Sequence, residues 1–408
     1  MDLLEGRIQN YAWGSRTALA ELLGKAVPAL HPEAELWLGA HPSAPSLVFR
    51  DGGWRSLLDL IADHPDRELG AAVVARFGPR LPFLLKVLAA ETPLSLQAHP
   101  DMAQARAGFA AEEAAEIPRD AARRNYKDAS HKPELLCALQ PFDAFSGFRR
   151  ASDTLRLLAA LGTKDLVSQA EVLRQAPDRR GLRAFYAALA SLTEASREKL
   201  VSATLHACAA HRDGDGEFAR ECDWVLRLGE LYPGDIGVVL ALLLNWVALE
   251  PGQAIYLPAG NLHAYLRGVG VEIMANSDNV LRGGLTPKHV DPAELLRVLT
   301  FADGPMPILS ANGEASSRGH EMEQTYDTPA PEFRLSRVEM RDGARFRAER
   351  REGPEILLCV AGRLAARSAN GDAHDLVQGG SVFVPASDGA YEIGGDGTLF
   401  RAAVGDAA

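Results

Sequence analysis

A change of sequence pattern near residue 152, reversed near residue 250, constrains the fold of this chain more than any other feature. Before residue 152, short apolar runs alternate with turn signals such as Gly78-Pro79, a pattern typical of β-strands. From residue 152 onward, apolar residues recur at helical spacing, for example Leu182, Phe185 and Leu189. After residue 250 the strand-and-turn pattern returns. We therefore predict a mainly β fold with a helical insertion over about 152–249.

Two apolar runs illustrate these patterns. Leu81–Leu88 is followed by turn signals at residues 91–93, and we predict that it is a buried strand. Val238–Leu244 is the most apolar stretch, and we expect a buried helix that has Asp235 as its N-cap and stops before Glu250. This stretch is far shorter than the roughly 20 residues needed to span a bilayer, so we expect no membrane association.

The composition is that of a folded globular protein. The chain has 408 residues, enough for two or three domains, and is 47% hydrophobic and 24% charged, which excludes collagenous and wholly disordered proteins. The net charge of −11 argues against a broad nucleic-acid-binding surface, because phosphate backbones need a basic face. An anionic substrate would need a locally basic pocket.

The cysteines indicate a reducing environment. The chain has 4 cysteines and no CxxC spacing, which argues against a disulfide framework and against a thiolate zinc site. The first residues include Asp2 and Glu5 and contain no apolar segment of signal-peptide length. We therefore expect a cytoplasmic protein.

A weak internal repeat links the two β regions. Residues 252–259 and 379–386 each place a glycine six positions before a Pro-Ala pair, which predicts a strand entered from a glycine turn. Five residues past the first proline lies His263, whereas five past the second lies Ala390. Either a β unit is duplicated and only its first copy keeps a ligand, or two β segments match by chance.

Two segments before the helical block carry candidate metal ligands. In an extended strand alternate residues share a face, so Gln97 and His99 would project together. Glu134 opens an apolar run, where an unpaired carboxylate would be costly unless it meets a cation. Each segment alone is also explained by a half-buried polar strand face or by a loop with solvated charges.

A third segment follows the helical block, where turn residues 258–261 deliver His263 after an apolar strand. Two imidazoles, one carboxylate and one amide oxygen together suit a divalent metal of the zinc type, with room left for a substrate. The absence of thiolates from this set favours a catalytic metal over a structural one. The candidate ligands are Gln97, His99, Glu134 and His263.

Motifs along most of the chain resemble those of one family, the class I mannose-6-phosphate isomerases, also called phosphomannose isomerases. The family's zinc ligands fall on the four candidate ligands named above, and one zinc ion per chain is implied. The matching motifs are Asn10–Gly14, Glu35–Pro42, Leu94–Asp101, Asn125–Glu134, Tyr232–Asp235, Tyr256–Tyr265 and Ala275–Lys288.

The resemblance implies three domains. A cupin-type β jelly roll, or double-stranded β-helix, would hold zinc over residues 1–151 and 250–318, with the helical insertion at 152–249. A second cupin-like β domain without metal ligands would cover 319–408. The cupin pattern falls on residues 252–263, and Arg267 stands where that pattern commonly has asparagine. We interpret this difference as family variation outside the metal site.

The reaction that the resemblance implies is the interconversion of mannose 6-phosphate and fructose 6-phosphate, which would link glycolysis to mannose and GDP-mannose metabolism. It requires ring opening, proton removal next to a carbonyl, and stabilisation of a cis-enediol or enediolate. We rank His131 and Lys132 first as proton shuttles and Glu272 next, with support of a metal ligand as the other role for His131. The resemblance gives Arg282 an active-site role, in which it would stabilise the enediolate or orient the substrate.

A small basic cluster would satisfy the need for a local anion site. The aromatic residues Trp37 and Tyr265 are candidates for the wall of a sugar pocket, although large aromatics, Trp13 above all, also serve as core. The candidate phosphate contacts are Ser95, Lys86, Lys132, Arg282 and Lys288.

Two other functions stay open at this point. Cupins with histidine and carboxylate ligands also hold iron and activate oxygen. A non-catalytic sugar-phosphate binder with a relic site is the other alternative, against which the complete ligand set weighs. We expect a small sugar phosphate as the partner, no nucleic acid, and a monomer, with a weak dimer as the alternative.

Overall fold

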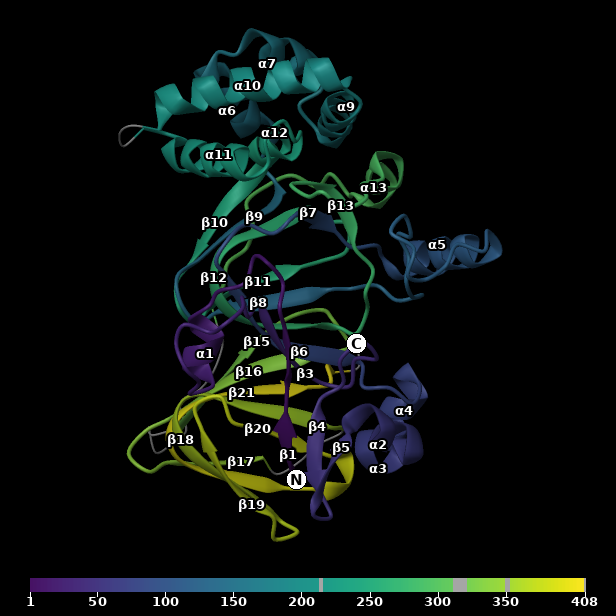
Figure 1. The fold of residues 1–408 in the computed structure, drawn as a ribbon, viewed down its shortest axis with the longest axis vertical. Helices are drawn as coiled ribbons and strands as arrows, with labels where there is room; N and C mark the ends of the chain where they lie inside the picture. Colours follow the sequence, from purple (N-terminus) through teal and green to yellow (C-terminus); the bar gives the residue numbers. More distant parts are fainter. Residues whose placement is uncertain (213–215, 311–320, 349–352, 407–408) are drawn as a thin grey trace.

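The computed structural model describes residues 1–212, 216–310, 321–348 and 353–406. Two antiparallel sheets follow one another along the long axis of the molecule, and a group of helices covers one end (Figure 1). The prediction of a mainly β protein interrupted by helices is therefore confirmed. We call the two sheets the middle sheet and the C-terminal sheet.

The middle sheet carries the predicted ligand segments. Its central strand is β12, which pairs with β7 and β9 near its start and with β6 and β8 near its end. The predicted strand at Leu81–Leu88 is confirmed as β6, and all its residues are buried. The strands are β2 (Arg7–Gln9), β3 (Glu35–Leu38), β6 (Phe83–Ala90), β7 (Leu96–Ala98), β8 (Glu134–Ala138), β9 (Phe142–Phe148), β10 (Leu244–Leu249), β11 (Gln253–Leu257), β12 (His263–Ala275), β13 (Leu281–Gly284) and β14 (Leu309–Ser310).

The C-terminal sheet also contains strands from the beginning of the chain. Strand β1 pairs with both β20 and β4, so the N-terminal residues join this sheet. The predicted boundary between residues 318 and 319 lies outside the described residues, and the division into three domains stays a prediction. The strands are β1 (Asp2–Glu5), β4 (Leu47–Arg50), β5 (Gly53–Ser56), β15 (Glu321–Tyr326), β16 (Arg334–Met340), β17 (Arg345–Ala348), β18 (Glu355–Ser368), β19 (Ala373–Val377), β20 (Ser381–Val384) and β21 (Tyr391–Ala403).

The helical insertion packs through the apolar faces that the sequence predicts. Leu182, Phe185 and Leu189 are buried on α9, and Asp178 caps this helix by accepting hydrogen bonds from two backbone N–H groups. The helices are α6 (Ala151–Leu161), α7 (Lys164–Gln169), α8 (Glu171–Gln175), α9 (Arg179–Ala190), α10 (Glu194–His211), α11 (Ala219–Leu231), α12 (Gly237–Leu240) and the 3₁₀ turn η1 (Ala241–Leu243).

The predicted helix up to residue 249 is wrong in its last part. The helical turns end at Leu243, and Leu244–Leu249 forms β10, which pairs with β9. Val247 and Leu249 are buried while Ala248 is exposed, which is the alternation of a strand. The residues that precede this strand are all apolar, so the sequence shows no clear change from helical to strand periodicity.

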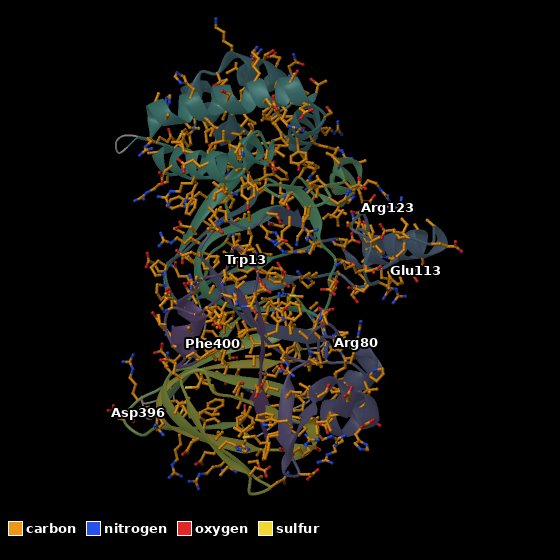
Figure 2. The ribbon with its side chains drawn as sticks, in the orientation of Figure 1. Trp13, Arg80, Glu113, Arg123, Asp396 and Phe400 are labelled. Atoms are coloured by element: carbon orange, nitrogen blue, oxygen red, sulfur yellow. The ribbon has the colours of Figure 1, made fainter. Side chains whose placement is uncertain are left out.

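The remaining helices lie beside the sheets. Helix α5 stands out from the body on an arm, where Glu113 and Arg123 are labelled (Figure 2). No helix in the described residues is long and apolar enough to cross a membrane. These helices are α1 (Ala18–Leu22), α2 (Leu57–Asp63), α3 (Pro65–Leu69), α4 (Ala71–Phe77), α5 (Met102–Ala114), α13 (Pro292–Val298) and the 3₁₀ turn η2 (Ala386–Asp388).

Candidate metal centre and active site

A cavity of about 490 Å³ opens at the middle sheet, and most of the predicted site residues line it. It receives side chains from β3, β6, β7, β8, β12 and β13, which lie next to one another in the sheet. The predicted residues on its wall are Trp13, Trp37, Lys86, Ser95, Gln97, Lys132, Glu134, Tyr265, Glu272, Arg282 and Lys288.

Three predicted ligands meet in a buried cluster. The Nε2 atoms of His99 and His263 lie 3.3 and 3.5 Å from Glu134 Oε2. None of these three buried atoms has a hydrogen-bond partner among the described residues. Buried polar atoms without partners are costly, so this arrangement indicates a site for a cation. Two imidazole nitrogens and one carboxylate oxygen are a donor set that fits zinc.

Backbone carbonyls fix the orientation of both imidazoles. His99 Nδ1 lies 2.7 Å from the carbonyl oxygen of Asn279, and His263 Nδ1 lies 3.1 Å from that of Asn261. Because a carbonyl oxygen only accepts, each Nδ1 carries the hydrogen. The Nε2 lone pairs are then free for a metal.

Strand register brings Gln97 to the same site. Gln97 on β7 lies directly opposite His263 on β12 and opposite Arg282 on β13. Residues directly opposite one another in a sheet project to the same face. The amide of Gln97 therefore lies beside the cluster, on the face that also carries Arg282.

The charges of the cluster suit a metal site at neutral pH. Burial alone would raise the pKa of Glu134. Lys132 opposes this effect, since its Nζ lies 2.9 Å from Glu134 Oε1, and so does His99. Together they hold the pKa of Glu134 well below its usual range. Burial lowers the pKa of His99 to about 4, against the opposing effect of Glu134. The carboxylate is therefore ionised and the imidazole of His99 neutral, as metal ligands must be.

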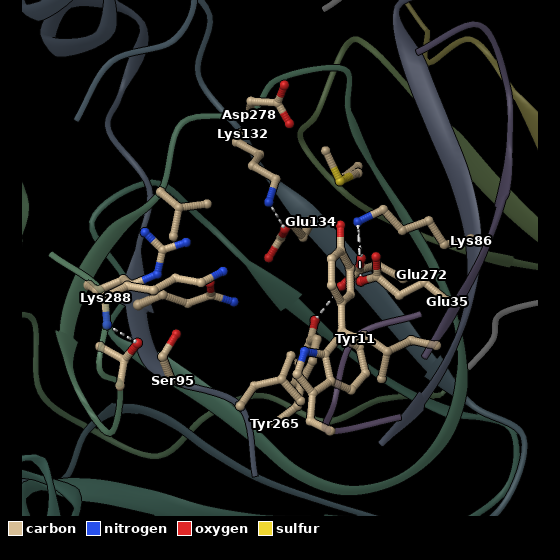
Figure 3. Close-up of a pocket in the computed structure, with 18 of the residues that line it drawn as sticks. Tyr11, Glu35, Lys86, Ser95, Lys132, Glu134, Tyr265, Glu272, Asp278 and Lys288 are labelled. Carbon is tan, nitrogen blue, oxygen red and sulfur yellow. Dashed lines mark hydrogen bonds and ion pairs between the residues drawn. The ribbon is translucent and has the colours of Figure 1, made fainter. Parts of the chain in front are cut away.

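One side of the cavity holds a network of two carboxylates around an ammonium group. Lys86 Nζ lies 3.1 Å from Glu272 Oε2 and 3.7 Å from Glu35 Oε1. The Tyr265 hydroxyl donates a 2.8 Å hydrogen bond to Glu272, and the Trp37 indole N–H donates a 2.7 Å bond to Glu35. Figure 3 shows Lys86, Glu272 and Glu35 together on one side of Glu134.

An irregularity in β12 explains how Tyr265 and Glu272 come to share this cavity. They are separated by an odd number of positions, so a regular strand would point them to opposite faces. The pairing of β12 with β9 shifts register between Tyr265 and Arg267. An extra residue at such a bulge re-aims the side chains that follow it.

Burial perturbs the ionisable groups of this network. Desolvation raises the pKa of Glu272 although Lys86 opposes the shift, and burial beside Glu272 raises that of Tyr265 well above its usual value. Burial would lower the pKa of Lys86, but Glu35 and Glu272 outweigh it and raise this pKa. Lys86 is therefore a cation, and Glu272 is a stronger base than an ordinary glutamate.

The opposite side of the cavity is cationic. Lys288 and Ser95 lie there, on the other side of Glu134 from Lys86 (Figure 3). Burial lowers the pKa of Lys288, and the like charges of Arg282 and Lys127 lower it further. In the part of the chain that the structure describes, no carboxylate lies within ion-pair distance of these three cations.

Known proteins match this chain over nearly its whole length. A family model for the catalytic domain of type I phosphomannose isomerase matches residues 1–151. The mannose-6-phosphate isomerase of Escherichia coli K12 is 39% identical over 403 residues, which cover 98% of this chain and 99% of that protein. The chain belongs to the mannose-6-phosphate isomerase family.

Members of this isomerase family outside bacteria match as well. The mannose-6-phosphate isomerase of Bos taurus is 32% identical over 402 residues, covering 93% of this chain and 92% of that protein. A solved structure of zinc-bound mannose 6-phosphate isomerase superposes with a TM-score of 0.87 at 39% identity, over 99% of both chains. The fold is therefore that of the mannose-6-phosphate isomerase family.

Among the described residues, His131 is the predicted site residue that lies neither on the cavity wall nor in the buried cluster around Glu134. Its Nε2 lies 2.6 Å from Glu332 Oε1, on the other side of the chain from Lys132. Alternate residues of an extended segment share a face, so Lys132 and Glu134 point together while His131 points away. This geometry does not support a proton shuttle at His131.

Several residues of the isomerase cavity escaped the sequence interpretation. Glu35 and Lys127 line it, as does Asp278, whose Oδ1 lies 3.4 Å from His41 Nε2. Glu35 shares a strand face with Trp37, two positions later, and this spacing could have identified it. Lys127 and Asp278 lie within matching motifs, but no local pattern indicated that segments so far apart in the sequence would meet at the cavity.

Proposed function

We propose that this chain is a zinc-dependent aldose–ketose isomerase that interconverts mannose 6-phosphate and fructose 6-phosphate through a cis-enediol or enediolate. The observation that carries the proposal is the set of three buried ligand atoms on His99, Glu134 and His263, which have no hydrogen-bond partner among the described residues. Glu134 also lines a cavity that holds a base and several cations. Membership of the mannose-6-phosphate isomerase family supports it.

His99, Glu134 and His263 would hold the ion, with Gln97 as a further ligand. Bound zinc would supply Lewis-acid chemistry at the substrate oxygens where negative charge develops. Lys132 keeps Glu134 ionised and would add a positive charge where the substrate binds, since it lines the cavity.

Glu272 is the best-supported proton shuttle. It lines the cavity, its pKa is raised by burial, and Tyr265 and Lys86 orient its two oxygens. A buried carboxylate with a raised pKa can take a proton from one carbon and return it to the next. This geometry favours Glu272 over Lys132, which is bound to Glu134, and over His131.

Arg282, Lys288 and Ser95 would bind the phosphate group. Burial lowers the pKa of Arg282, but a guanidinium stays charged at neutral pH. Lys86, predicted as a phosphate contact, already faces two carboxylates, which favours its role as a partner of Glu272. Trp37 and Tyr265 would form part of the sugar pocket wall through their place on the cavity.

The expected biological setting follows from this activity. The reaction would link glycolysis to mannose and GDP-mannose metabolism. A monomeric cytoplasmic enzyme, built from two cupin-like domains and a helical insertion, is the organisation that we propose.

A proton NMR experiment on the purified protein tests the function. With mannose 6-phosphate in deuterium oxide, we expect fructose 6-phosphate to accumulate and deuterium to enter at the carbon that exchanges its proton. Oxygen consumption without isomerisation would support the iron-dependent alternative. Binding of the sugar phosphate without turnover would support a non-catalytic binder.

A further inference from the structure

Asn279 lies behind the metal cluster and holds a segment of chain through its side-chain amide. Its Oδ1 accepts hydrogen bonds from the backbone N–H groups of Lys127 and Asp128 at 2.7 and 3.2 Å. Its Nδ2 donates to the carbonyl oxygens of Asp128 and Ser130 at 2.8 and 2.9 Å. Asn279 is 0% exposed. Segment 127–130 leads directly into Lys132 and Glu134, so this amide fixes the approach to a ligand.

The main chain of the same residue contacts a second ligand. The carbonyl oxygen of Asn279 accepts the 2.7 Å hydrogen bond from His99 Nδ1 that turns the Nε2 lone pair toward the cluster. One buried residue therefore touches the His99 imidazole through its backbone and the Glu134 segment through its side chain. Asn279 itself does not line the cavity, so it acts on the site through the residues that it holds.

Neighbouring groups complete the connection between the two segments. Asp128 accepts a 2.9 Å hydrogen bond from the Ser277 hydroxyl and a 2.8 Å bond from the backbone N–H of Asp278. Asp128 also accepts a 2.9 Å bond from the N–H of Ser130. Hydrogen bonds from Ser277, Asp278 and Asn279 thus join the segment that carries Asn279 to the segment that leads to Glu134.

We infer that Asn279 is a positioning residue of the metal centre, which couples zinc binding to the order of segment 127–130. The inference rests on the proposed zinc site. Groups that orient a ligating imidazole contribute to metal affinity, and two equilibria that share one structural element must influence each other reciprocally. Zinc binding should therefore order the segment, and loosening the segment should weaken zinc binding.

Asn279→Ala tests this coupling without using turnover. The variant keeps the backbone carbonyl but loses the amide that holds the segment. We expect the zinc affinity, measured by competition with a chromogenic chelator, to fall by roughly 10- to 100-fold. In the wild type, zinc should slow hydrogen exchange at the amides of Lys127 and Asp128. In Asn279→Ala, zinc should leave their exchange nearly unchanged.

Two further variants separate positioning from general destabilisation. Tyr391→Phe removes a buried hydrogen bond to Glu355 in the C-terminal sheet, so it should lower the unfolding midpoint and leave zinc affinity unchanged. Ser277→Ala is milder than Asn279→Ala and should weaken zinc binding by a smaller factor. If Asn279→Ala does not fold, the zinc affinity of Ser277→Ala tests the coupling instead.

The outcomes also separate this inference from the proposed function. Wild-type zinc affinity in Asn279→Ala, or in Ser277→Ala where only that variant folds, would overturn the coupling while isomerase activity of the wild type stood. An equal loss of zinc affinity in Tyr391→Phe would overturn it as well. A wild type that binds zinc without isomerising sugar phosphates would overturn the function alone.

Discussion

The middle and C-terminal sheets each bury a glutamate, Glu134 and Glu355, and each of these residues is only 2% exposed. Both oxygens of Glu355 are engaged, because Arg401 donates to them at 2.6 and 2.9 Å and the Tyr391 hydroxyl donates at 2.5 Å. Glu134 is bound on one side only, by Lys132, and its other oxygen faces two imidazole nitrogens without a hydrogen bond.

The difference shows how burial alone fails to identify a functional carboxylate. A buried acid whose hydrogen-bonding capacity is fully used by the protein stabilises one arrangement of the chain. A buried carboxylate oxygen that accepts no hydrogen bond, and that lies beside two imidazole nitrogens in the same state, can bind a ligand such as a metal ion. Glu355 is therefore structural and Glu134 is available to a metal.

The sharpest way to break this comparison is the same substitution at both glutamates. Glu134→Gln removes the anionic ligand, so we expect zinc to be lost and isomerase activity to fall by at least roughly 10³-fold, since a Lewis acid contributes several kcal/mol to the barrier. Glu355→Gln should keep both zinc and activity at 25 °C. Metal analysis and a coupled isomerase assay measure these effects, and loss of zinc in both variants would contradict the distinction.

Arg401→Met tests the structural half of the comparison. It leaves Glu355 buried without its cation, which should cost about 3–5 kcal/mol of unfolding free energy. Urea denaturation measures the loss. The folded fraction should still bind zinc, and a stability equal to the wild type would show that the pair is not structural.

Glu272→Gln tests the base on the cavity wall. We expect kcat to fall by roughly 10²- to 10³-fold with zinc content unchanged, because proton transfer loses its acceptor. Glu272 acts in its ionised form and burial raises its pKa, so wild-type kcat should fall as pH is lowered through a value above that of an ordinary glutamate. If kcat of Glu272→Gln falls at low pH in the same way as kcat of the wild type, Glu272 is excluded as the base.

Lys288→Ala tests the cationic side of the cavity. The loss of one charge-assisted hydrogen bond to phosphate should raise KM for mannose 6-phosphate by about tenfold. KM for unphosphorylated mannose should change much less. Equal changes for the two substrates would remove Lys288 from the phosphate site.

Tyr265→Phe should have the smallest effect. Its hydroxyl donates to Glu272 and favours the ionised carboxylate, so its removal should raise the pKa of Glu272 further. The acid limb of kcat should then move upward by roughly one pH unit. A profile that does not move, or that moves to lower pH, would show that this hydrogen bond does not tune the base.

Local patterns in the sequence predict much of this site. Alternation along a strand placed Gln97 and His99 together, and an apolar run marked Glu134 as the start of β8. The glycine turns before residues 253 and 381 are also present, with φ of 88° at Gly252 and 83° at Gly379. These features depend on residues close in sequence, where spacing determines direction.

Long-range pairing was beyond the reach of those patterns. Nothing local indicated that β1 would join the C-terminal sheet, or that Asn279 would meet His99. The continuous apolar run before β10 concealed a change from helix to strand. The sequence also showed no sign that His131 would face Glu332 while Lys132 faces the cavity, an arrangement that arises because adjacent residues of an extended chain face opposite ways. A proton shuttle at His131 stays a prediction.

The most direct test of the central claim is zinc titration of chelator-treated protein, with conversion of mannose 6-phosphate as the readout. If His99, Glu134 and His263 form the catalytic metal site, the metal-free protein should be inactive and activity should return in proportion to added zinc. It should reach a plateau at one ion per chain. Full activity in the metal-free protein would contradict the claim. So would a Glu134→Gln variant whose activity rises with zinc to the same plateau as the wild type.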